Sequence, residues 1–149
     1  MSTLYSEIID NFSKMIFEHK LTALSENERD EWITSLMKTA CSKFGKTCRQ
    51  DLTKRNDIEG YFEADLSDEE IDIICNYMIC EWLKPYLYSS EVLRERLSTR
   101  DYSEYSPANL IEKINTVYNE TKKNSRLLAV NYTYSNRDYK EKIKEVVSR

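Results

Sequence analysis

Glycine and proline each occur only twice in this chain of 149 residues. All-β sandwiches and barrels need frequent turn residues, and low-complexity linkers are rich in the same two amino acids. Their scarcity argues against both architectures and favours long helices joined by few turns. The composition agrees, since 32% charged and 40% apolar residues suit amphipathic helices around a core.

Apolar residues at helical spacing predict two helices in the first third of the chain. The first covers residues 3–19, where Leu4, Ile8, Phe12 and Ile16 fall on one face. The second begins at Ser25, which opens a capping box with Glu28, and ends at Gly45.

Further helices are predicted in the second half. A capping box from Ser67 to Glu70 opens the third, and we expect Pro85 to end or kink it near Lys84. A short fourth helix should cover residues 90–97. The fifth starts at Ser106-Pro107 and runs to Tyr134; its stripe is polar in the middle, so we expect it to leave its own core and meet a neighbour.

The stretch 45–65 lies between the second and third helices and is polar and charged. It predicts an irregular, extended loop with room for a short hairpin, projecting from the helical body. Loops of this length in compact domains are often functional, so it is a candidate contact arm.

These predictions define an all-α, bundle-like domain of four to five helices over residues 1–134. It has a long C-terminal helix. The lysine-rich residues 135–149 form an extended C-terminal tail that we expect a partner to order.

The sequence shows no arrangement of residues typical of catalysis. Gly45-Lys46-Thr47 resembles the end of a phosphate loop, but it follows a predicted helix where a phosphate loop follows a strand. His19 is the only histidine, and the four cysteines lack Cys-x-x-Cys spacing. We expect no enzyme activity, no cofactor and no metal.

Neither a membrane nor a secretory route is predicted. No apolar run approaches the roughly 20 residues that span a bilayer, and the first residues lack a basic region followed by an apolar stretch. Charge is unevenly distributed: residues 67–105 carry nine acidic against four basic side chains, while 106–149 carry nine basic against five acidic. A subunit that assembles head to tail needs such segregation.

Tyrosines gather in the second half of the chain, and tyrosine is enriched at protein interfaces. Tyr132, Tyr134 and Tyr139 fall beyond the predicted core, near the lysines at 140, 142 and 144. This end predicts a protein contact. A small nucleic-acid-binding or regulatory protein, using basic residues interleaved with aromatic ones, is the alternative.

Several short segments follow one another in an order typical of one group of proteins. They are Cys-x-x-Asp-Leu at 48–52, Tyr61-Phe62, Leu66-Ser-x-x-Glu70, Met78-Ile-Cys-Glu-Trp-Leu83, Arg100-Asp-Tyr-Ser, Ser106-Pro-Ala and Tyr132-Thr-Tyr134. Over residues 48–139 the chain resembles the neck proteins of tailed bacteriophages, the head-tail connector adaptors that sit under the portal ring.

The resemblance implies a structural virion protein that is assembled in the bacterial cytoplasm and then forms a ring, commonly a dodecamer, in the neck. It would bind the portal protein above and the next neck or tail component below, with DNA passing through the lumen without specific binding. By analogy, the portal would meet Tyr132, Tyr134, Tyr139 and Lys140. Neighbouring subunits would meet the 45–65 loop and the acidic helix start, represented by Asp51, Arg55, Asp68 and Glu69.

Overall fold

The computed structural model describes residues 2–19, 21, 30–88 and 107–136, and within these ranges the chain is mostly helical, as predicted. The helices are α1 (Tyr5–Glu18), α3 (Asp30–Phe44), α4 (Asp68–Tyr88) and α7 (Pro107–Asn136). The strands are β1 (Thr3–Leu4), β2 (Arg55–Asn56) and β3 (Tyr61–Phe62). The predicted capping box at Ser25 and the helix over 90–97 lie outside the described residues. The tail was predicted from residue 135, but α7 continues to Asn136, and the rest of the tail lies outside the described residues.

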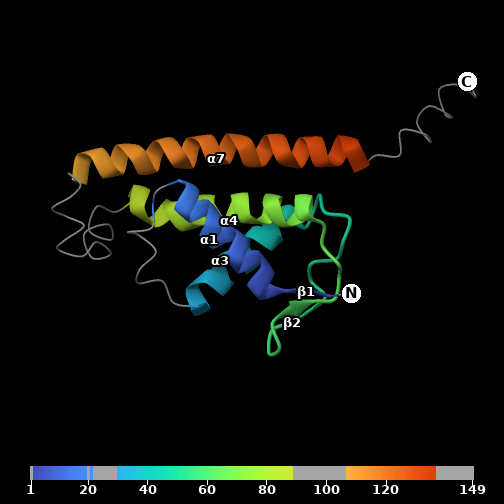
Figure 1. The fold of residues 1–149 in the computed structure, drawn as a ribbon. Helices are drawn as coiled ribbons and strands as arrows, with labels where there is room; N and C mark the ends of the chain where they lie inside the picture. Colours follow the sequence, from blue (N-terminus) through green and yellow to red (C-terminus); the bar gives the residue numbers. More distant parts are fainter. Residues whose placement is uncertain (1, 20, 22–29, 89–106, 137–149) are drawn as a thin grey trace, which may run out of the picture.

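Helix α4 is the centre of the fold, with α1, α3 and α7 packed against it (Figure 1). Its sequence from Ile71 to Leu83 is apolar on most sides, as a helix buried among others must be. Ile73, Ile74, Met78 and Ile79 are completely buried. The core therefore surrounds α4.

Helix α7 has 30 residues, which corresponds to about 45 Å. It lies along α4 (Figure 1), so the prediction that it leaves its own core is wrong. Ile114 and Val117 are buried against α4, and so are the polar residues Thr121 and Ser125. The Ser125 hydroxyl can be buried because it donates to the Thr121 carbonyl at 2.7 Å, whereas the buried Thr121 hydroxyl has no hydrogen-bond partner among the described residues.

Pro85 was predicted to end or kink the third helix, and it does not end it, since α4 continues through Pro85 to Tyr88. A proline removes a single backbone hydrogen bond, which tertiary contacts can offset in a last turn. Here Trp82 supplies such a contact, because it is buried and its ring meets that of Phe12 in α1 edge to face at 6.0 Å between centroids.

The stretch 45–65 contains the predicted hairpin and is less irregular than expected. Strands β2 and β3 pair antiparallel, and β1 adds to β3 with Thr3 opposite Phe62, where the first helix was predicted to start. The Thr3 hydroxyl accepts from Leu66 N–H at 2.8 Å and donates to the Ala64 carbonyl at 3.0 Å. These contacts fix the base of the hairpin to the helical body, while its tip projects on the side away from α7 (Figure 1).

Candidate protein-interaction surfaces

A buried carboxylate joins the end of α7 to the start of α4. Glu70 is 5% exposed and completes the predicted capping box, accepting from Ser67 N–H at 2.9 Å while its own N–H donates to Ser67 Oγ at 3.2 Å. Its other oxygen accepts from the Tyr132 hydroxyl at 2.9 Å and from the Cys48 thiol at 3.2 Å. The Tyr132 hydroxyl in turn accepts from Arg49 N–H at 3.0 Å.

This junction corrects the interpretation of Tyr132. The residue was placed beyond the core as a portal contact, but it is 2% exposed and its ring meets Phe44 edge to face at 5.3 Å. A buried side chain cannot reach a partner unless the domain opens. Tyr134, two residues further along the helix, is 54% exposed and remains accessible. Tyr139 and Lys140 lie outside the described residues.

An acidic groove lies between α1 and the start of α4. Its open cavity of about 960 Å³ is lined by six carboxylates and a single cation, together with Asn11, Leu66 and Ile71. The charged residues are Glu7, Asp10, Lys14, Asp65, Asp68, Glu69 and Asp72. Glu7, Asp10 and Lys14 follow one another at helical spacing along α1, while Asp68, Glu69 and Asp72 come from the first turns of α4. The fold thus brings two acidic helix faces together.

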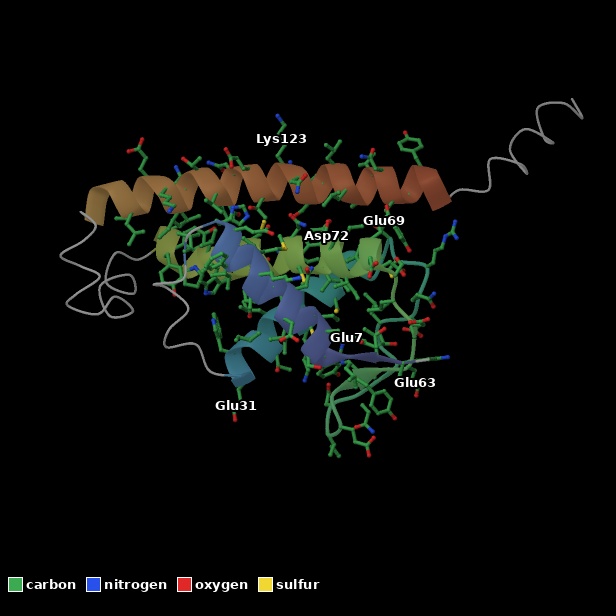
Figure 2. The ribbon with its side chains drawn as sticks, viewed as in Figure 1. Glu7, Glu31, Glu63, Glu69, Asp72 and Lys123 are labelled. Carbon is green, nitrogen blue, oxygen red and sulfur yellow. The ribbon has the colours of Figure 1, made fainter. Side chains whose placement is uncertain are left out.

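The negative charge in this groove is poorly compensated. Burial raises the pKa of Asp72 above its usual range, and the nearby Glu18 carboxylate raises it further. In Figure 2, Glu7, Glu69 and Asp72 lie around the angle between α1 and α4, whereas Glu31 lies at the distant start of α3. Within the described residues, no group of three or more side chains gathers closely enough to hold a metal ion. The groove is suited to a surface that carries several cations.

A basic pocket lies where α3, α4 and α7 meet, with a volume of about 350 Å³. Its charged lining consists of Lys43, Glu81, Lys84, Lys122 and Arg126. Glu81 pairs with Lys43 and, at 2.8 Å, with Lys84, and the pKa of Glu81 is lowered because these bonds outweigh the effect of burial. The charges of Lys122 and Arg126 then leave the pocket positive.

The acidic groove and the basic pocket face opposite sides of α4. Asp72 lines the first and Glu81 the second. They are nine residues apart, about two and a half helical turns, so their side chains point in opposite directions from the helix axis. One molecule therefore presents two surfaces of opposite charge that cannot neutralise each other.

Of the residues predicted to meet neighbouring subunits, only Asp68 and Glu69 line the groove. Asp51 instead accepts from Thr53 N–H at 3.0 Å and closes its own turn. Arg55 is half-buried in β2, where it donates to the Leu52 carbonyl at 3.4 Å and pairs with Asp57 at 3.5 Å. Both stabilise the 45–65 segment.

Glu7, Asp10 and Lys14 on α1 were not predicted to form part of an interaction surface. Their spacing of three and four residues marks a charged stripe beside the apolar one, and that pattern was visible in the sequence. Asp65 also lines the groove, but no pattern in the sequence predicted this, because its position depends on how the chain folds before α4.

Reactive cysteines are not a feature of the described chain. Burial raises the pKa of the Cys41 and Cys75 thiols to about 12 and that of Cys48 to about 11. None of the helices within the described ranges is long and apolar enough to cross a bilayer.

Comparison with known proteins found no relative, since no family model, no curated protein and no solved structure matches the chain. The two charged surfaces must therefore be interpreted from their own chemistry.

Proposed function

We propose that this protein is a structural subunit that assembles head to tail into a ring, and that it acts as a head-tail connector adaptor in a phage neck. In this role it binds the portal protein and links capsid to tail, with no enzyme activity and no cofactor. The resemblance in residues 48–139 supports the phage neck. The positions of the charged surfaces support the ring.

The observation that carries the assembly is the opposite charge on opposite sides of α4. A contact between two different surfaces of identical subunits is heterologous, and it forms a ring when the rotation between neighbouring subunits closes and an open filament when it does not. The acidic groove of one copy meets the basic pocket of the next, which pairs Glu7 and Glu69 with Lys122 and Arg126. Complementary charge of this kind steers association and suppresses wrong orientations.

Mixing of charge-reversed variants tests this arrangement. One variant carries Glu7→Lys and Glu69→Lys in the groove, and the other carries Lys122→Glu and Arg126→Glu in the pocket. Each alone should remain monomeric by sedimentation or light scattering at a concentration where the parent chain assembles. Their mixture should assemble again with the two variants alternating, because the intact pocket of one meets the intact groove of the other and the two reversed surfaces are also complementary in charge.

Glu31→Lys and Lys46→Glu serve as controls, since both residues are exposed and neither lines the two surfaces. They should assemble as the parent chain does. If the mixture stayed monomeric, or if each reversed variant assembled normally, the head-to-tail contact would be wrong. A parent chain that stays monomeric when concentrated and does not bind purified portal rings would remove the connector proposal altogether.

The second candidate is nucleic-acid binding, favoured by the exposed Lys122, Lys123 and Arg126 on α7. Such binding to short DNA should weaken steeply between about 50 and 200 mM salt, because condensed counterions are released on binding. A connector would instead let DNA pass through its lumen without retaining it. DNA affinity lost in the Lys122→Glu, Arg126→Glu variant would support the second candidate.

A further inference from the structure

The tip of the β2–β3 hairpin carries an apolar side chain that the fold leaves in water. Ile58 is 97% exposed, more than any other large hydrophobic residue of the described chain. A fully buried isoleucine contributes about 1.5–3 kcal/mol relative to an exposed one, so this position contributes almost nothing to the core.

The backbone around Ile58 is nevertheless held in one conformation. Asn56 Oδ1 accepts from both Ile58 N–H and Glu59 N–H at 3.0 Å. Gly60 N–H donates to the Asn56 carbonyl at 2.8 Å, and Gly60 has a φ of +74°, which a residue with a side chain rarely adopts. These hydrogen bonds fix the conformation of the turn that presents Ile58 to solvent.

Further contacts anchor the turn to the helices. Tyr5 N–H donates to the Gly60 carbonyl at 2.8 Å, and the Tyr5 hydroxyl donates to Asp57 at 2.7 Å. Asp57 also pairs with Lys38 of α3 at 3.4 Å. A rigid turn reduces the entropy lost when its tip becomes buried, so Ile58 is already organised for insertion into a partner.

A second exposed apolar feature lies on α7, on the opposite side of the molecule from the hairpin tip (Figure 1). Leu127, Val130 and Tyr134 are 56%, 49% and 54% exposed. With Lys123 they stand at helical spacing along one line, which we call the outer stripe, and Lys123 projects away from α4 (Figure 2). Tyr132, between the last two, faces the core instead.

The charges beside the two features are complementary. Ile58 is flanked by Asp57 and Glu59, and both are exposed. The outer stripe begins at Lys123, with Arg126 next to Leu127. Contact between them would surround an apolar centre with opposite charges, as in a typical protein interface.

We propose that Ile58 of one copy docks on the outer stripe of α7 of the next copy, between Leu127 and Val130, with Glu59 beside Lys123. The contact is heterologous, like the proposed ring, and rests on that proposal for its place in an assembly. One molecule cannot make it internally, because the hairpin tip and α7 lie on opposite sides of the helical body (Figure 1).

Site-directed cross-linking tests this contact in the full chain. Tagged Ile58→Cys is mixed with untagged Val130→Cys and treated with a short bis-maleimide. The matched control is Phe17→Cys mixed with Val130→Cys, since Phe17 is also exposed, at 73%, but lies at the end of α1. Cys48 is half-buried and the other native cysteines are buried, so each single variant mixed with the parent chain gives the background.

The Ile58–Val130 pair should cross-link at least about tenfold faster than the Phe17–Val130 pair. Equal rates, or Ile58→Cys linking mainly to itself, would overturn the inference. Cross-links that appear only after residues 137–149 are removed would also overturn it, because the chain's own end would then be the occupant of the stripe.

Self-association gives an independent measurement. Ile58→Ser should weaken assembly at least about tenfold, and Phe17→Ser should leave it unchanged. If Ile58→Ser assembled normally while the charge-reversed variants did not, the hairpin contact would be wrong and the ring proposal would stand. If the Ile58–Val130 pair cross-linked specifically in a chain that forms no ring and does not bind the portal, the hairpin contact would stand and the ring proposal would be wrong.

Discussion

Glu70 joins three segments that are far apart in the sequence. Its carboxylate accepts hydrogen bonds from Ser67 at the start of α4, from Cys48 in the preceding loop and from Tyr132 near the end of α7. A buried carboxylate is tolerated only when its oxygens are bonded in this way. Single residues at this junction therefore decide whether α7 remains docked.

Replacing Tyr132 with phenylalanine should reduce the free energy of unfolding by about 1–3 kcal/mol. The change removes the donor to Glu70 and the acceptor for Arg49 N–H, leaving polar groups buried without these partners. Tyr88→Phe is the control, because Tyr88 is 81% exposed and should change stability by less than about 0.5 kcal/mol. Urea unfolding measures the free energy of unfolding of both variants. Equal losses of stability would contradict a structural role for the Glu70 junction.

Stability should decrease on acidification, partly through Glu70. Burial raises the pKa of this carboxyl, but hydrogen bonds from Ser67, Cys48 and Tyr132 outweigh burial and lower it below its usual range. A pKa lowered in the folded state adds stability above the unfolded value of about 4.3, and this stability is lost as the pH falls through the folded pKa.

Glu70→Gln should therefore be less stable at pH 7 and should show a shallower loss of stability between about pH 5 and pH 2. Part of the slope should persist, because bonds from Thr53 and Tyr5 lower the pKa of Asp51 and Asp57 as well. Unfolding curves collected across this range measure the slope. A variant with the parent's full slope would show that Glu70 does not contribute.

At the scale of elements, the docking of α7 along α4 is the feature that sequence reasoning placed wrongly. The stripe of α7 contains Thr121 and Ser125 at its middle, and polar residues there suggested a helix that meets another molecule. In the fold both residues are buried in the core, where Ser125 Oγ approaches Cys80 Sγ of α4 at 4.0 Å. Small polar side chains allow two helices to approach closely.

Ile114→Ala measures this packing. Ile114 is completely buried, so the truncation should reduce the free energy of unfolding by about 2–5 kcal/mol. Leu127→Ala on the same helix should cost less than about 1 kcal/mol, since Leu127 is 56% exposed. Similar values for the two variants would mean that α7 does not pack on α4 as described.

For the whole molecule, the proposed assembly brings the two charged surfaces of neighbouring copies into contact. The acidic groove gathers six carboxylates against one cation, and the basic pocket lies on the other side of α4, so in that assembly the compensating charge comes from a second copy.

Asp72→Asn tests how one charge of the groove affects the stability of the monomer and the strength of its assembly. Burial and Glu18 raise the pKa of Asp72, so its charged form costs stability at pH values above that pKa, and the uncharged variant should be more stable at pH 7 by up to about 1 kcal/mol. The same variant should assemble more weakly, because the groove loses a charge. Glu31→Gln should change neither property, and a variant with unchanged stability and unchanged assembly would contradict this account.

The helical class, the capping box at Ser67 and the long helix from Pro107 could be predicted from the sequence, because spacing, caps and turn residues act over a few neighbours. The hairpin within 45–65 was predicted only as one option within an irregular loop. The tertiary structure decided that β1 joins β3, that α4 continues through Pro85 and that Tyr132 is buried on Glu70. It also decided that α1 and α4 share one acidic groove. Each of these depends on which faces meet across long separations, and local patterns carry no information about that choice.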